Sequence, residues 1–220
     1  MVLRYLCTAA AVSLLSVAMP AGATPIGPPP LSCASNTCQG SIYELTYSGS
    51  PLPPPSLAST ATTQTFEITL TINPTAYNGG GAFINAVAPK VSSMVDAVTL
   101  VSAPGGSGNW ATMMGGINAG GCSGSGSGFV CAEDRTPPQD APVPFAGTYS
   151  WVFDLTIPTG TLLTGTNAAS IKVQYTDSSG NKVGALVSEP ITLEVIPEPS
   201  TLLLVAGGLA FLARRGRMTQ

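Results

Sequence analysis

Strict alternation of apolar and polar side chains over residues 65–73 is the feature that most restricts how this chain can fold. Phe66, Ile68, Leu70 and Ile72 share one face of the segment, while glutamate and threonine side chains occupy the other. Successive side chains of a strand point to opposite faces, so a period of two predicts a half-buried antiparallel strand.

The same period recurs along the chain. Residues 149–157 place Tyr149, Trp151, Phe153, Leu155 and Ile157 on one face, and shorter strands are predicted at 43–47, 171–175 and 191–195, with a less regular one over 91–101. The turn sequence at 177–181 predicts a hairpin, and only residues 83–87 and the hydrophobic ends are candidates for helix. Many short alternating strands predict an all-β body, a single antiparallel β-sandwich of jelly-roll or Ig-like type, with a barrel as the alternative.

Two hydrophobic segments flank this body. At the N-terminus, Arg4 precedes an apolar stretch over 6–17, and Ala21 and Ala23 form an A-x-A cleavage site. This order is that of a secretory signal peptide, so residues 1–23 are predicted to be removed and the mature chain to start at Thr24. Residues 24–196 then form one domain.

The C-terminal segment, residues 197–217, has three parts. Pro197, Glu198 and Pro199 form an extended kink, because each proline fixes its own φ and restricts the residue before it. An uncharged run over 201–213 follows, and as a short hydrophobic helix it would span roughly 20 Å of a bilayer core of about 30 Å. We predict it as a membrane anchor through Leu202, Leu203, Leu204, Val205, Leu209, Phe211 and Leu212, with Arg214, Arg215 and Arg217 held on the cytoplasmic side.

Together, the signal peptide and this tail resemble those of PEP-CTERM proteins, which Gram-negative producers of exopolysaccharide export. The resemblance implies export by the Sec translocon, with the precursor anchored transiently in the inner membrane and its body in the periplasm. It also implies recognition of Pro197, Glu198 and Pro199 by an exosortase-type transpeptidase, and release to the cell surface or outside the cell. A role in the extracellular matrix or biofilm, with exopolysaccharide as partner, is the function that the resemblance implies.

Four cysteines remain once the signal peptide is removed: Cys33, Cys38, Cys122 and Cys131. Export to an oxidising compartment favours disulfides, and four cysteines allow three connectivities. We predict the local pairs Cys33–Cys38 and Cys122–Cys131, because each pair brackets one short loop. Zinc is the weaker alternative, since the spacings differ from those of paired zinc knuckles. The glycine- and serine-rich stretch 118–128 is expected to be a surface loop.

Charge and composition exclude several functions. The body has ten acidic and four basic side chains, a net charge of −6, which disfavours nucleic acid as a partner. The chain has no histidine, so Ser-His-Asp and Cys-His catalysis and HExxH zinc sites are excluded. The adjacent Glu133 and Asp134, expected in a loop, are the remaining candidates for a hydrolase, and we interpret them as solvated. No catalytic residue, metal or cofactor is predicted.

Two aromatic residues are candidate glycan contacts, because flat rings stack on the apolar faces of sugars. Trp110 lies next to loops and outside any clean alternating strand, and Tyr77 precedes Asn78 in a turn. Filling of the core is the alternative role for Trp110. The leading functional prediction is a non-enzymatic surface or matrix protein. A carbohydrate-binding module that engages exopolysaccharide is the alternative.

Overall fold

The computed structural model of this chain describes residues 25–27, 31, 33, 38–48, 62–124, 126–135, 140–163 and 166–196. The predicted signal peptide, the Pro197-Glu198-Pro199 motif, the apolar anchor and the terminal arginines lie outside these residues. In the described part of the chain, no helix is long and apolar enough to cross a membrane.

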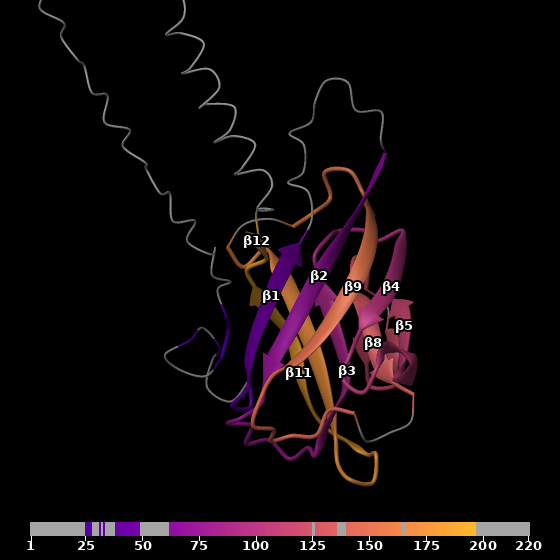
Figure 1. Cartoon of the computed structure of the whole chain (residues 1–220). Helices are drawn as coiled ribbons and strands as arrows, with labels where there is room; N and C mark the ends of the chain where they lie inside the picture. Colours follow the sequence, from indigo (N-terminus) through magenta and orange to yellow (C-terminus); the bar gives the residue numbers. More distant parts are fainter. Residues whose placement is uncertain are drawn as a thin grey trace, which may run out of the picture.

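Two five-stranded sheets form the body (Figure 1). Sheet A has the order β12 (Glu194–Ile196), β1 (Ile42–Ser48), β2 (Thr63–Asn73), β9 (Tyr149–Pro158) and β4 (Ala97–Ser102). Sheet B has the order β11 (Lys182–Ile191), β10 (Ala169–Thr176), β3 (Phe83–Lys90), β8 (Val130–Asp134) and β5 (Trp110–Met114). A third, two-stranded sheet joins β6 (Gly116–Asn118) to β7 (Gly121–Gly124), and a 3-10 turn, η1, covers Ser107–Asn109.

The alternating segments form the strands that their pattern predicts. In β2, burial alternates as expected, and Phe66, Ile68, Leu70 and Ile72 enter the core. β9 pairs with β2 in antiparallel register, so that Leu70 lies opposite Trp151 and Ile68 opposite Phe153. The apolar faces of both sheets meet in one core, and the all-β antiparallel sandwich is therefore confirmed.

Aromatic side chains connect the two sheets through this core. Trp110 of β5 meets Trp151 of β9 edge to face, with ring centroids 5.3 Å apart. Near one end of the sandwich, the buried hydroxyls of Tyr43 in β1 and Tyr175 in β10 share a hydrogen bond. Tyr77 stacks on the Tyr175 ring at a centroid distance of 4.7 Å. These contacts fix how the sheets lie against each other.

Three segments differ from their predictions. The possible helix at 83–87 is strand β3, in which all residues from Ile84 to Pro89 are buried because both of its faces are covered. A strand with both faces buried shows no alternation, so its sequence resembles that of a buried helix. The strand expected over 91–101 begins only at Ala97. Glu133 and Asp134 lie in β8 and not in a loop.

The hairpin predicted at 177–181 is confirmed, with β10 and β11 on either side of the turn. One Asp177 carboxylate oxygen accepts hydrogen bonds from the backbone N–H groups of Ser179 (2.8 Å) and Asn181 (2.9 Å). The hydrogen bonds to Asn181 and Ser179 hold the pKa of Asp177 below its usual value. This carboxylate shapes the turn.

Replacing Tyr43 by Phe should lower the free energy of unfolding by about 1–3 kcal/mol, because the buried Tyr175 hydroxyl loses its partner. Urea unfolding monitored by tryptophan fluorescence would measure the loss. The matched control is the double variant Tyr43→Phe/Tyr175→Phe, which removes both hydroxyls and should cost less than the sum of the single variants. Additive losses would contradict a direct bond.

Alkaline pH should weaken the fold through the same tyrosine. Burial raises the pKa of Tyr43 from 10.0 to about 12, against the opposing effect of its hydrogen bond to Tyr175. Below pH 10 the folded and unfolded chains both hold this proton. Between 10 and 12 only the folded chain does, so stability should fall by about 1.4 kcal/mol per pH unit for this group. Urea midpoints measured across this range should fall more steeply for the native chain than for Tyr43→Phe; equal slopes would refute the assignment.

Candidate functional site

The end of the described chain is held on the edge of sheet A. β12 pairs in parallel with β1, so that Glu194 lies opposite Thr46, Val195 opposite Tyr47 and Ile196 opposite Ser48. The strand ends at Ile196. Pro197, the first residue of the Pro-Glu-Pro sequence, directly follows this strand in the sequence.

The N-terminal side of the body meets the same strand. Ile26 bridges Tyr43 in antiparallel fashion, and each backbone N–H donates to the other carbonyl at 2.8 Å. Because this bridge is antiparallel, the backbone traced from Gly27 back to Pro25 has the same direction as β1. β12 has that direction too. Both ends of the described body point toward the Ser48 end of one sheet edge.

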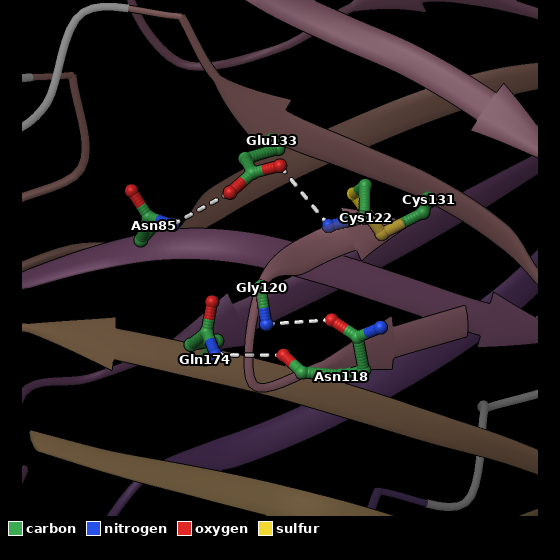
Figure 2. Close-up of a disulfide and its surroundings, with 7 residues drawn as sticks. All are labelled: Asn85, Asn118, Gly120, Cys122, Cys131, Glu133 and Gln174. Atoms are coloured by element: carbon green, nitrogen blue, oxygen red, sulfur yellow. Dashed lines mark hydrogen bonds between the residues drawn. A yellow bond between two sulfur atoms is a disulfide. The ribbon is translucent and has the colours of Figure 1, made fainter. Parts of the chain in front are cut away.

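A hairpin forms a third layer on the outer face of sheet B (Figure 2). β6 and β7 contact β3, β8 and, through β6, β10. Between this hairpin and the sheet lies a second, small core composed of Ala86, Ala88, Cys122, Phe129 and Cys131, with Ile117 packed against it. The stretch expected to be a plain surface loop is in large part this packed hairpin.

A disulfide anchors the hairpin. Cys122 of β7 is bonded to Cys131 of β8, with the two Cα atoms 5.6 Å apart. The other bond joins Cys33 to Cys38, next to the Tyr43 hydroxyl, which donates to the Cys38 carbonyl at 3.4 Å. Both predicted local pairs are thus present: the first closes a short loop ahead of β1, and the second ties the hairpin to β8.

Glu133 holds the hairpin through hydrogen bonds. Its carboxylate does not face a second carboxylate as the catalytic acid of a hydrolase would. One of its carboxylate oxygens accepts from the Cys122 backbone N–H at 3.0 Å, and the other accepts from the Asn85 side-chain amide at 3.4 Å. Its neighbour Asp134 is buried at the other side of the strand. Since adjacent strand residues point to opposite faces, the two carboxylates do not face one another across a substrate cleft.

Polar contacts hold the tip of the hairpin. The Gln174 side-chain amide donates to the Asn118 carbonyl at 3.2 Å, and Lys182 Nζ donates to the Ala119 carbonyl at 2.9 Å. Asn118 Oδ1 accepts from the Gly120 backbone N–H at 2.6 Å, which closes the turn (Figure 2). The hairpin is therefore attached to β10, β11 and β8 independently of its disulfide.

Two lysines that sequence reasoning did not single out meet on this face. Lys90 Nζ lies 5.5 Å and Lys172 Nζ 4.6 Å from the centroid of the Phe129 ring. A cation over an aromatic face is attracted by the ring quadrupole. The three residues are distant in sequence. Only Lys172 could have been expected on an outer face, because it alternates with the apolar Ile171 and Val173 of its strand.

The two proposed glycan contacts lie in the core. Trp110 is 2% exposed and its indole N–H donates to the Pro104 carbonyl at 2.8 Å. Tyr77 is 7% exposed, and its hydroxyl accepts from the Gly81 backbone N–H at 3.0 Å. Stacking on a sugar needs an open ring face, so the prediction of glycan contact is wrong for these two rings, and the alternative of core filling holds for Trp110.

An open cavity of about 360 Å³ lies beside Phe129. Met94, Val95 and Met114 contribute apolar side chains, and the rest of the lining is three glycines, Ser127 and Phe129 itself. Within the described residues, no three His, Cys, Asp or Glu side chains gather in a group that could hold a metal ion.

A comparison with known proteins identifies a family motif in the C-terminal part of the chain. Residues 195–217 match the family model described as the PEP-CTERM protein-sorting motif. Val195 and Ile196 of β12 are its first two residues. The predicted resemblance is confirmed: the chain carries the sorting motif of exported proteins whose membrane-anchored precursors an exosortase processes.

No curated protein matches the chain. Among solved structures, the body is similar to the major pilin subunit of Bacillus cereus, with 12% sequence identity and a TM-score of 0.31. The match covers 71% of this chain and 40% of the pilin chain.

Gly121 is a position at which the hairpin should be sensitive to substitution. Its φ is +105°, and a Cβ there would lie 2.0 Å from a Glu133 carboxylate oxygen. Gly121→Ala should therefore lower stability by about 1–3 kcal/mol and speed reduction of the Cys122–Cys131 bond. Gly80→Ala, where a Cβ meets nothing within 4 Å, is the matched control. Thiol trapping under mild reductant would compare them, and equal reduction rates would contradict this role.

Proposed function

We propose that this protein is a non-enzymatic structural component of the cell surface or extracellular matrix, delivered there by its C-terminal tail. The observation that carries the proposal is the sorting motif at 195–217, whose first residues form an edge strand of a folded, disulfide-bonded body. Because the folded body continues directly into the sorting signal, the sorting pathway would deliver the body itself.

The export route belongs to the same proposal. The Sec translocon delivers the body to the periplasm, and the apolar run before Arg214 holds the precursor in the inner membrane. The exosortase-type transpeptidase then recognises Pro197, Glu198 and Pro199. Proline restricts the backbone to extended conformations, so this segment offers the enzyme an extended chain next to the membrane. Both ends of the body point toward one end of sheet A, which supports a body suspended from that end.

We propose that the partner in the matrix is exopolysaccharide or another matrix protein. The alternative function, a carbohydrate-binding module, has lost its two suggested contact residues, because Trp110 and Tyr77 are buried. The structural role requires no aromatic binding platform, and it is consistent with the rigid attachment of the hairpin and loops to the sandwich.

Replacement of Pro197, Glu198 and Pro199 by alanine should block processing, because the transpeptidase loses its recognition segment. In cells that contain the enzyme, full-length precursor should accumulate in the membrane fraction, and the released form should fall at least tenfold. Mass spectrometry of the released protein and immunoblots of cell fractions would measure both.

Met218→Ala is the control, since residue 218 lies beyond the matched motif. It should be processed like the native chain. Normal release of the triple-alanine variant would refute the sorting role of the Pro-Glu-Pro segment.

A further inference from the structure

The last described strand, β12, finishes at one end of the sandwich, which we call the Ser48 end. β1 runs toward Ser48, and its parallel partner β12 brings Ile196 to the same end. β2 starts here and β9 finishes here at Pro158, because each strand is antiparallel to its neighbour. β4 is antiparallel to β9 and begins here, at Ala97. The connection from β3 to β4, residues 91–96, therefore lies at the Ser48 end (Figure 1).

The open cavity beside Phe129 is at this same end. Met94 and Val95 of the β3–β4 connection line it, together with Met114, the last residue of β5. Phe129 bridges Lys90, the last residue of β3, so the cavity lies where β3 and β5 finish. We call Met94, Val95 and Met114 the apolar rim.

The apolar rim is open to solvent. Met94 is 54% and Met114 55% exposed, and Val95 is half-buried. The third methionine of the body, Met113, is 39% exposed, but it points to the other face of β5 and does not line the cavity. Apolar side chains that are exposed together beside a cavity indicate a contact surface.

A short stretch of chain separates this end of the body from the predicted anchor. Ile196 is the last residue of β12, and the apolar side chains of the anchor begin at Leu202. The chain between these two residues spans at most roughly 20 Å when fully extended. In a membrane-anchored precursor, Ile196 at the Ser48 end is therefore held within that distance of the anchor.

We propose that the apolar rim is a membrane-contact surface: while the tail anchors the precursor, Met94, Val95 and Met114 insert into the interface of the same bilayer. This inference rests on the proposed function, because it requires the anchored precursor, and it names a lipid surface as the partner of the body. The contact fixes which end of the body faces the bilayer. It lasts only while the tail is attached, since the rim has fewer apolar groups than one myristoyl chain, which alone binds a membrane marginally.

Area and connectivity favour the bilayer over a second copy of the chain. A specific protein interface buries roughly 800 Å² on each partner, which three partly exposed side chains do not supply. A bilayer contact needs less area, because the tail already holds the body next to the lipid and raises its effective concentration.

Charge does not select the partner. The net charge of −6 on the body opposes an anionic membrane and a second copy alike. Close to the rim the signs are mixed, because Lys90 adjoins the cavity through Phe129 and the exposed Asp96 follows Val95. The contact is therefore apolar, and it should form on lipids without net charge.

The methionines of the body test this contact without any substitution. The disulfide-bonded chain with its tail is inserted into phosphatidylcholine vesicles, collected by flotation and treated with dilute hydrogen peroxide. Peroxide transfers one oxygen atom to the thioether sulfur and leaves water, and the rate follows the exposure of the sulfur. Mass spectrometry then measures the sulfoxide formed at each methionine.

The expected result is a reversed order of oxidation. In free solution, the exposures predict that Met94 and Met114 are oxidised at least as fast as Met113. On vesicles, Met94 and Met114 should be oxidised about fivefold more slowly than Met113, which serves as the internal reference.

A charged residue in the rim should remove the protection. In Met94→Glu, Met114 should again be oxidised at least as fast as Met113, because a carboxylate resists insertion into lipid. Val183→Glu is the matched control: Val183 is 42% exposed and lies at the other end of the sandwich, where β11 begins. It should leave the protection unchanged, and circular dichroism would establish that both variants fold.

Unprotected methionines on the vesicles, or protection of Met114 that survives Met94→Glu, would overturn the proposal. Protection that disappears when the protein is diluted about a hundredfold in lipid would identify a second copy as the occupant. Protection confined to vesicles that contain phosphatidylglycerol would identify electrostatic binding. Either result would reject an apolar membrane contact.

Flotation separates this inference from the proposed function. A chain that fails to float with the vesicles contradicts the anchored precursor, and this inference with it. A chain that floats while its methionines stay unprotected refutes the membrane contact alone.

Discussion

The pairing of β2 with β9 is the interaction on which the rest of the body depends. These are long strands with a continuous register from Thr63 opposite Pro158 to Ile72 opposite Tyr149. β1 attaches to the free side of β2 and β4 to the free side of β9, so sheet A is assembled outward from this pair. Its inner face supplies Ile68, Leu70, Trp151 and Phe153 to the core, against which sheet B then packs.

The sequence predicted the parts of this arrangement that depend on local pattern. Alternation located β2 and β9 because one face of each is buried and the other is solvated. The hairpin turn at Asp177 was recognisable because its carboxylate bonds locally, to residues two and four positions away. The short loops between cysteines correctly indicated local disulfide pairs, since little chain separates the partners.

The sequence did not predict features that arise from contacts between distant residues. β3 lies between two layers, so its composition carries no period. The β6–β7 hairpin is rich in glycine and serine, and its burial comes from Cys122 and Phe129 packing on a sheet formed by other segments. Glu133 looked like a loop acid because its partners, the Cys122 amide and Asn85, lie 11 and 48 residues away. The sequence around Trp110 does not alternate, so it gave no sign that Trp151 would meet this ring.

The parallel pairing of β12 with β1 has a mechanical consequence. If the chain is attached to a larger structure at its C-terminal end, as proposed, any drag on the body acts as tension along β12. That tension acts along the strand, so the hydrogen bonds that pair β12 with β1 are loaded together in shear instead of being opened one at a time. Behind them, the buried Leu193 and Ile191 anchor the strand in the core. The short edge strand thus distributes an external force over the sheet before it reaches the hydrophobic interior.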